Sequence, residues 1–353
     1  MQQRCIILVG GQTTGHILPM MAVGQAYRRA ARLRDVVVLG DPDGPEAGIV
    51  PRYGFEFRAI GGAPLRGVHG AGRRIGAYWA TAKAFVAART MLAESPVALV
   101  AGFGGYVTAA PLLAARSLGI PTAIFEPNAV PGLTNRRLRA LADLCLVGLR
   151  ETTTRPGWSD AIVAGHPIRA EVLEVRSRGH EPGTLRLLVT AGLRGSAFLN
   201  VEAPELCAEL RSRGVRVTVH HQAGDEPTDE IARAYARRGI SARVEPFIAD
   251  MPAAFEGCDA VICAGGAGTL SEIAALHLPA LVVPIAGTAD DHQAANARAF
   301  SPHLRAACMT EGTWDAARAA EALVALADIP ATSAPPPPDA AATFVEHCER
   351  LIA

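Results

Sequence analysis

The sequence predicts an α/β protein with two doubly wound, Rossmann-like domains. Short apolar runs alternate with helical patterns in both halves of the chain, which is typical of parallel sheets covered by helices. A chain of 353 residues also exceeds the size at which one hydrophobic core usually stops growing. We expect a first domain at residues 1–166, a second at 167–338, and a last helix at 339–353 that could pack back on the first domain.

The expected elements follow in order along the chain. The first half has strand-like runs at residues 6–9, 36–39, 98–100 and 122–125, and a helix over about 18–31 with Pro19 in its first turn. The second half has strand-like runs at 185–190, 215–220, 261–263 and 280–284, with helical patterns after Asn200, near 230–238 and from Thr269. Four consecutive prolines, 335–338, form an extended spacer before the last helix.

Composition and charge exclude several function classes. Lys and Arg together number 34, as do Asp and Glu, so no net field would attract nucleic acid. The seven cysteines are scattered without a C-x-x-C pair, which argues against a disulfide framework or a zinc site and favours a reducing cytoplasm. Neither a signal-peptide pattern nor a long apolar stretch is seen, so we expect a soluble or peripheral protein. The sequence gives no indication of the oligomeric state.

A glycine-rich loop lies between the first strand and the first helix. Gly10-Gly11-Gln12-Thr13-Thr14-Gly15-His16 could expose main-chain N–H groups to an anion, or form a plain tight turn. The loop has neither the G-x-G-x-x-G spacing of dinucleotide sites nor the lysine of a P-loop. His16 ends it at the carboxyl edge of the strands, where it could act as a base or serve as a capping or packing residue.

Two further loops are expected at the same edge. Gly102–Tyr106 follows a strand, and its glycines allow a ligand to approach the backbone closely. Glu126 and Asn128 end the next strand, and Asn135 opens the following helix. A carboxylate with two amides suits a hydroxyl-rich ligand, although Asn135 could equally be a helix cap.

The second half carries a comparable turn. Cys263–Glu272 has the pattern of a strand, a Gly-rich turn and a helix start, whose N–H groups could hold a diphosphate. Glu272 could accept hydrogen bonds from ribose hydroxyls, or simply complement the helix dipole. Residues 290–293 with Asn296 could bind sugar hydroxyls or form a solvated helix start.

A basic and aromatic segment lies between Pro64 and Leu92. Its helical spacing brings together Arg73, Arg74, Ile75, Tyr78, Trp79, Lys83 and Phe85. Such a face could contact an anionic membrane surface, because apolar side chains enter the headgroup boundary and each cation adds on the order of 1 kcal/mol. The alternative is an amphipathic helix packed on the sheet, with Trp79 and Phe85 in the core.

Taken together, the ordered motifs resemble the MurG family of bacterial cell-wall glycosyltransferases. The similarity spans nearly the whole chain, and its most specific parts are GGQTTGHILP, FGGYVTAAPLLAARSLGIP, FEPNAVPGLTNR, GHPIR, FIADM, GAGTLSEIAALHLPALVVP and HQAANA. The resemblance implies the GT-B fold, in which two Rossmann-like domains face each other across a cleft. It also implies a UDP-sugar donor, most readily UDP-N-acetylglucosamine, a prenyl-phosphate-linked lipid acceptor, no metal or cofactor, and a peripheral place on the inner face of the cell membrane.

The resemblance assigns roles to residues of this chain. His16 becomes the candidate base, which takes a proton from an acceptor hydroxyl during an inverting displacement. The acceptor side would comprise Thr13, Gly15, Gly104, Tyr106, Glu126, Asn128 and Asn135. The donor side would comprise Arg169, Gly192, Arg194, the main chain at Ile248, Gly266, Ala267, Gly268, Thr269, Glu272, His292 and Gln293. Helix N-termini would replace a metal ion at the leaving diphosphate, and Asp41-Pro42-Asp43 is interpreted as a turn and not as a metal site.

The chain departs from the family pattern where substrates are recognised. Gly192-Leu193-Arg194-Gly195 stands where the family has a Gly-Ser-(Gln or Leu)-Gly turn, Phe125 replaces a His, and Ala264-Gly265 replace Arg-Ser. Two alternatives therefore stay open. One is a specialised relative that glycosylates another prenyl-phosphate lipid, as in moenomycin-type phosphoglycolipid assembly. The more distant one is a nucleotide-sugar epimerase or a non-catalytic sugar-nucleotide-binding protein of the same fold.

Overall fold

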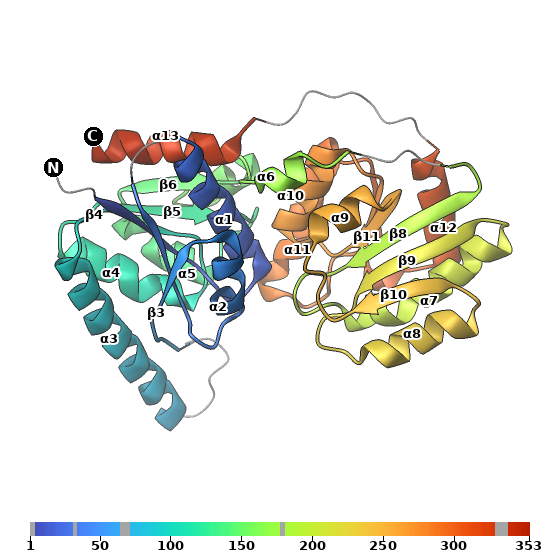
Figure 1. Ribbon diagram of the computed structural model, residues 1–353, viewed down its shortest axis with the longest axis horizontal. Helices are drawn as coiled ribbons and strands as arrows, with labels where there is room; N and C mark the ends of the chain where they lie inside the picture. Colours follow the sequence, from blue (N-terminus) through green and yellow to red (C-terminus); the bar gives the residue numbers. More distant parts are fainter. Residues whose placement is uncertain (1–3, 31–33, 64–70, 177–180, 329–337) are drawn as a thin grey trace. The chain divides into compact units, whose positions relative to one another are not determined.

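The computed structural model describes residues 4–30, 34–63, 71–176, 181–328 and 338–353, without the side chains of residues 71–74 and 289. The chain divides into two compact units. Unit 1 comprises Met1–Arg169 and Pro338–Ala353, and unit 2 comprises Ala170–Pro337. Each unit is a parallel sheet with helices on its faces (Figure 1). The sequence placed the boundary between the domains after residue 166.

Unit 1 contains a seven-stranded parallel sheet in the order β3-β2-β1-β4-β5-β6-β7. Its central strands are Val-, Leu- and Ala-rich runs that are buried along their whole length, as a parallel sheet covered on both faces requires. The strand order reverses between β1 and β4, which is where α/β sheets bind ligands. The strands are β1 (Cys5–Val9), β2 (Val36–Gly40), β3 (Glu56–Ala59), β4 (Val97–Gly102), β5 (Thr122–Glu126), β6 (Leu144–Val147) and β7 (Ile162–Val163).

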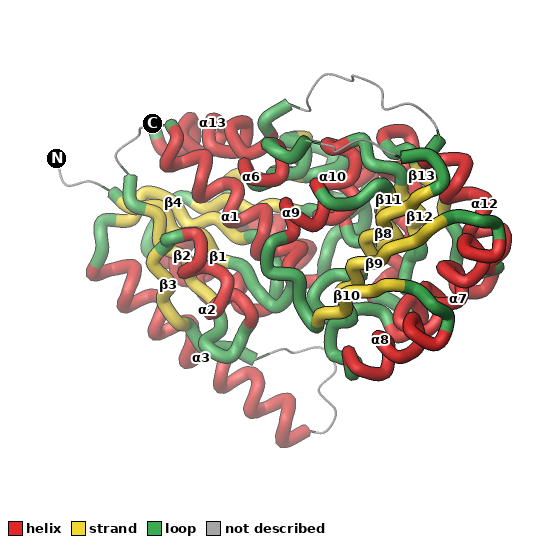
Figure 2. The backbone as a smooth tube through the Cα atoms, turned by 45° about the vertical axis from the view of Figure 1, so that its right-hand side comes forward, coloured by secondary structure: helices red, strands yellow, loops and turns green. Residues whose placement is uncertain are grey.

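Helices cover both faces of this sheet (Figure 2). On one face, α1 (Thr14–Arg29) and α13 (Ala340–Ile352) pack together and share a buried cluster with the strands. On the other face, α3 (Ala71–Glu94) packs beside α4 (Ala109–Ser117). The shorter helices of this unit are α2 (Pro45–Ile49) and α5 (Leu133–Leu138).

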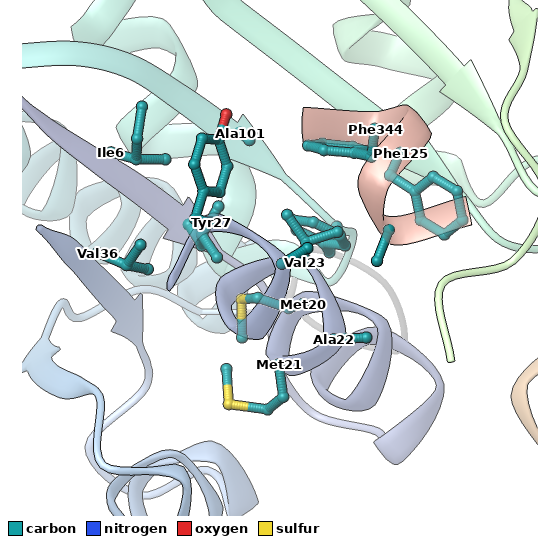
Figure 3. Packing of buried hydrophobic residues seen from close by; sticks show 14 of the residues in the cluster. Ile6, Met20, Met21, Ala22, Val23, Tyr27, Val36, Ala101, Phe125 and Phe344 are labelled. Carbon is teal, nitrogen blue, oxygen red and sulfur yellow. The ribbon is translucent and has the colours of Figure 1, made fainter. Parts of the chain in front are cut away.

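The last helix, α13, is fixed to unit 1 by aromatic packing and by charge. The ring of Phe344 stacks on Phe103 at 5.3 Å between centroids and meets Phe125 edge-on at 6.2 Å. Figure 3 shows Phe344 and Phe125 in the same cluster as the side chains of α1. Arg34 also pairs with Glu349 at 3.1 Å. The end of the chain therefore completes the core of the first unit.

The start of α1 differs from the sequence-based expectation. The helix begins at Thr14 rather than near residue 18, because Thr13 already has the extended backbone of an N-cap. Pro19 consequently lies in the second turn and not in the first. Its missing N–H leaves the carbonyl of Gly15 without its usual helical donor.

Unit 2 contains a six-stranded parallel sheet in the order β10-β9-β8-β11-β12-β13. The strands are β8 (Thr184–Thr190), β9 (Arg216–Gln222), β10 (Ser241–Glu245), β11 (Ala260–Cys263), β12 (Ala280–Val282) and β13 (Ala306–Cys308). The helices are α6 (Ala170–Leu173), α7 (Ala197–Ser212), α8 (Thr228–Arg237), α9 (Met251–Glu256), α10 (Ala267–Leu276), α11 (His292–Phe300) and α12 (Ala316–Ala327). The faces of α7, α8 and α12 that meet the sheet form its main apolar cluster.

Candidate functional site

The loop between β1 and α1 holds the imidazole of His16 in one orientation. Nδ1 of His16 lies 2.9 Å from the carbonyl oxygen of Gly11 and 3.2 Å from Oγ1 of Thr13. A carbonyl oxygen can only accept, so Nδ1 carries the proton and the lone pair of the ring lies on Nε2. Gly104 follows the neighbouring strand β4 and borders this ring. The geometry presents Nε2 as the proton-accepting atom.

Tyr106 joins the loops that follow β1, β2 and β4. Its phenol donates to the carboxylate of Asp41, and its main-chain N–H donates to Oε1 of Gln12 at 3.4 Å. Burial and the nearby Asp41 carboxylate raise the pKa of Tyr106 above its ordinary value, so the phenol stays protonated at neutral pH. The turn predicted at residues 41–43 is confirmed, because the N–H of Asp43 donates to Oδ1 of Asp41 at 3.0 Å.

Glu126, at the end of β5, is 1% exposed and holds its own loop together. Oε1 accepts from the main-chain N–H and the side-chain amide of Asn128 at 2.9 and 3.0 Å. Oε2 accepts from the N–H of Gly132 and the amide of Asn135, both at 2.9 Å. Four donors engage this carboxylate, so the geometry favours a positioning role over direct contact with a sugar.

Asn135 is not the helix cap that the sequence left as an alternative. The N-cap of α5 is Gly132, and Asn135 is a buried residue inside the helix. Its amide nitrogen also donates to the carbonyl of Phe125 at 3.0 Å. Among the residues that the structure describes, its Oδ1 has no hydrogen-bond partner. That oxygen is an acceptor that the loop itself does not satisfy.

In unit 2, side chains of α11 fix the turn that follows β11. The N–H of Gly265 donates to Oε1 of Gln293 at 3.1 Å, and its carbonyl accepts from Nδ2 of Asn296 at 3.0 Å. Oε1 of Gln293 also accepts from the N–H of Ile285 at 2.9 Å. No side chain fits at Gly265, because an added Cβ would stand 2.4 Å from the carbonyl oxygen of Gln293. The start of α10 is thus held before any ligand arrives.

A buried glutamine that sequence reasoning missed joins two segments assigned to the donor. Nε2 of Gln222, at the end of β9, donates to the carbonyl of Gly192 at 2.6 Å. Oε1 of Gln222 accepts from the N–H of Ile248 at 2.9 Å, so this N–H is engaged inside the fold. Gly195 and Gly224 bring the turns after β8 and β9 into backbone contact. Arg194 is exposed at the same turn.

The other residues assigned to the donor fall into three places. Arg169 belongs to unit 1, where its guanidinium donates to the hydroxyl of Tyr53 at 3.0 Å. His292 opens α11 and is half-buried. The first turn of α10 comprises its N-cap Gly266 with Ala267, Gly268 and Thr269, and Glu272 is buried one turn further on.

Helix α3 carries an exposed apolar face. Ile75 and Tyr78 are 58% exposed and Trp79 is 67% exposed. The alternative prediction that Trp79 packs in the core is therefore wrong. Lys83 is exposed on the same helix. The prediction that Phe85 belongs to the membrane-contacting face is also wrong. Phe85 packs against the buried cluster beneath α3 and does not belong to the exposed face. The side chains of Arg73 and Arg74 lie outside the described residues.

The described residues offer no grouping of three His, Cys, Asp or Glu side chains that could hold a metal ion. Within the same ranges, no helix combines the length and the apolar character that crossing a bilayer requires. The cysteines there are free thiols, and burial raises the pKa of Cys145 to about 11. A thiol buried in this way stays protonated and unreactive at neutral pH, whereas Cys308 is exposed.

Comparison with known families places both halves of the chain. Residues 6–146 match the glycosyltransferase family 28 N-terminal domain, and residues 186–351 match the glycosyltransferase family 28 C-terminal domain. The two matched ranges contain the β1–α1 loop and the Gly265 turn respectively. The chemistry-bearing turns of both units therefore lie inside the family's domains.

The two curated relatives described below are named for the same enzymatic activity. An Alcanivorax borkumensis enzyme, UDP-N-acetylglucosamine--N-acetylmuramyl-(pentapeptide) pyrophosphoryl-undecaprenol N-acetylglucosamine transferase, is 36% identical over 84% of this chain and 82% of its own. A Sorangium cellulosum enzyme of that name is 36% identical over 96% of this chain and 84% of its own. The crystal structure of Acinetobacter baumannii MurG has a TM-score of 0.71 and 27% identity, and covers 98% of this chain and 99% of its own. Neither the moenomycin-type alternative nor the epimerase or non-catalytic alternative is favoured.

Proposed function

This chain belongs to the MurG family within glycosyltransferase family 28, and we propose that it transfers N-acetylglucosamine from UDP-N-acetylglucosamine to N-acetylmuramyl-pentapeptide pyrophosphoryl-undecaprenol. The observation that carries this is 36% identity, over 84% and 96% of the chain, to two transferases named for the reaction. Its two parallel α/β sheets give it the two-domain GT-B fold of the Acinetobacter structure.

We assign the base to Nε2 of His16. The acceptor hydroxyl would give its proton to Nε2 while its oxygen attacks the anomeric carbon, and the bond from that carbon to UDP would break. One such displacement inverts the configuration. The support for this role is the Nδ1–H tautomer set by Gly11, together with the small Gly104 beside the ring.

We assign the donor to unit 2, at the start of α10. The N–H groups of its first turn and the helix dipole suit a diphosphate, and Gln293 and Asn296 fix the turn through Gly265. Arg194 adds an exposed cation in the turn after β8, the strand next to β11. Positive charge from these groups would allow the leaving UDP to depart without a metal ion.

We also propose that α3 brings the enzyme to the inner face of the cell membrane as a peripheral protein. An acceptor anchored by a prenyl chain obliges the enzyme to work at the bilayer surface. Tyr78 and Trp79 are exposed aromatic side chains of the kind that enter the headgroup boundary, and Lys83 adds attraction to anionic lipid.

The assignment of the substrates is tested with defined donors and acceptors. Purified protein is given UDP-N-acetylglucosamine or another UDP-sugar, with either the muramyl-pentapeptide pyrophosphoryl lipid or a phosphoglycerate-linked prenyl lipid. We expect UDP release only with UDP-N-acetylglucosamine and the muramyl lipid together. Glycosylation of the phosphoglycerate-linked lipid, with the muramyl lipid inert, would overturn the assignment in favour of the specialised alternative.

A further inference from the structure

Glu46, in α2, is a buried carboxylate next to the loop that carries His16. Its side chain is 0% exposed. Oε2 accepts from the main-chain N–H of Gln12 at 3.0 Å, and Oε1 accepts from that of Asp41 at 2.9 Å. Burying a charge in this way is costly unless it is hydrogen-bonded, so these two bonds decide where the carboxylate sits.

Three glycines make room for this carboxylate. An added Cβ at Gly11, Gly40 or Gly44 would stand 2.0, 2.5 or 2.5 Å from the nearest atom of Glu46. All three positions therefore require glycine for as long as Glu46 keeps its place. Three glycines around one carboxylate indicate that the surrounding backbone is shaped to hold the side chain of Glu46 in this position.

The Gln12 N–H and the Gly11 carbonyl belong to the same peptide group. Its N–H donates to Glu46, and its carbonyl oxygen accepts from Nδ1 of His16 at 2.9 Å. A negative charge at the N–H end polarises the peptide and makes its oxygen a better acceptor, because hydrogen bonds in a chain strengthen one another. The carboxylate thus acts on the imidazole through one peptide group.

We propose that Glu46 is a positioning residue for His16, which keeps the imidazole in its Nδ1–H tautomer and strengthens Nε2 as a base through the Gly11–Gln12 peptide. This inference rests on the proposed role of His16 as the base. No proton moves to Glu46, and its charge is unchanged through the reaction.

The backbone of Gln12 supports the same role. Its φ is +73°, in the left-handed region that non-glycine residues rarely adopt. The bond from the Gln12 N–H to Glu46 helps to hold this conformation, and with it the direction of the Gly11 carbonyl. Glu46 also holds Asp41, whose carboxylate accepts from the phenol of Tyr106.

The test uses Glu46→Gln with Glu349→Gln as the matched control. A Gln side chain keeps the volume at position 46 but must turn an NH₂ group toward one of the two main-chain donors. We expect kcat to fall roughly tenfold to a hundredfold, with the KM for UDP-N-acetylglucosamine within about twofold. Nitrogen-15 NMR of His16 should show loss of the pure Nδ1–H tautomer.

Glu349 is a buried carboxylate of the same unit that pairs with Arg34. The control variant Glu349→Gln should therefore lower Tm, while kcat and the His16 spectrum stay as in the wild type.

A second pair of variants separates this inference from the role of His16. In a His16→Ala background, Glu46→Gln should have no further effect on kcat, because the Gly11 carbonyl then has no imidazole to orient. Equal effects in both backgrounds, or an unchanged His16 tautomer in Glu46→Gln, would overturn the proposal. If His16→Ala leaves kcat unchanged, the base assignment fails, and the NMR result alone decides whether Glu46 orients the ring. Where Glu46→Gln does not fold, Glu46→Asp keeps the charge and should retain the tautomer with a smaller loss of kcat.

Discussion

Gly104 lies so close to the imidazole of His16 that an added Cβ would stand 2.8 Å from its Nε2. The φ of Gly104 is +106°, which is a conformation that residues with a side chain rarely adopt. Both facts require glycine at this position. A side chain at residue 104 would therefore crowd Nε2, the atom that the acceptor hydroxyl would approach under the proposed base role of His16.

The first prediction concerns His16 itself. Replacing His16 by Ala should lower kcat about a hundredfold or more, which is the usual contribution of a positioned general base. UDP affinity should not change, because the proposed donor turn belongs to unit 2. Steady-state kinetics and calorimetry with UDP measure the two effects. His347→Ala, in α13 of the same unit, is the control that should behave as the wild type. An unaffected kcat in His16→Ala would leave His16 as a packing residue.

The centre of each sheet could be predicted from the sequence, and the edges could not. β1, β2, β4 and β5 are runs of apolar residues buried on both faces, which is a strong local signal. The edge strands β3 and β10 carry Glu, Arg and Ser, and are partly exposed. Their apolar pattern is therefore weak, and only pairing with a neighbouring strand in the folded protein defines them.

In the candidate site, too, features with a local sequence pattern could be predicted, and contacts between distant segments could not. The glycine-rich turns could be located from sequence because glycine marks a tight turn wherever it follows a strand. The side chains that hydrogen-bond to those turns could not be predicted from the sequence. Glu46 reaches the Gln12 N–H across 34 residues, and Gln222 reaches Ile248 across 26. The only sequence signal for Glu46 was the presence of glycines at 11, 40 and 44, which becomes informative once the strands are placed side by side.

The second prediction concerns the donor site. Glu272→Ala should weaken UDP binding by about 1.5–3 kcal/mol if its carboxylate accepts hydrogen bonds from ribose hydroxyls. Calorimetric titration with UDP measures this loss, and a chelator should leave the wild-type affinity unchanged. Glu230→Ala, which removes an exposed acid from the first turn of α8, is the control for a mere helix-dipole effect. Loss of UDP affinity on chelation would contradict the proposal that the donor site works without a metal ion.

The third prediction concerns the exposed face of α3. Combining Trp79→Ser with Lys83→Glu should reduce sedimentation with anionic vesicles and transfer to an acceptor embedded in a membrane. Transfer to a short-chain acceptor in solution should not change, because both side chains are exposed on α3, which covers the face of the sheet opposite to α1. Arg237→Glu, an exposed charge reversal on α8 of unit 2, serves as the control. If both activities of the double variant fall together, the face stabilises the fold and does not dock on lipid.

The last prediction concerns acid stability and starts from a buried histidine of unit 2. Nε2 of His221 lies 3.0 Å from Oδ1 of Asn200, and Nδ1 lies 2.9 Å from the hydroxyl of Tyr235. Burial, with a smaller effect of the neighbouring His220, lowers the pKa of His221 to about 4. An unfolded histidine has a pKa of about 6.5, so the unfolded chain binds this proton more readily between these values.

The stabilisation from neutral His221 is therefore fully present above pH 6.5 and is lost as the pH falls toward 4. A difference of about 2.5 in pKa corresponds to about 3 kcal/mol over that range. Hydrogen exchange of the β9 amides should show a steep loss of protection from pH 7 to pH 4.5 in the wild type. His221→Gln should be less protected at pH 7 but should lose less on acidification, whereas the exposed His303→Gln should follow the wild type. Parallel pH dependence in the wild type and in His221→Gln would show that another group governs the acid response of unit 2.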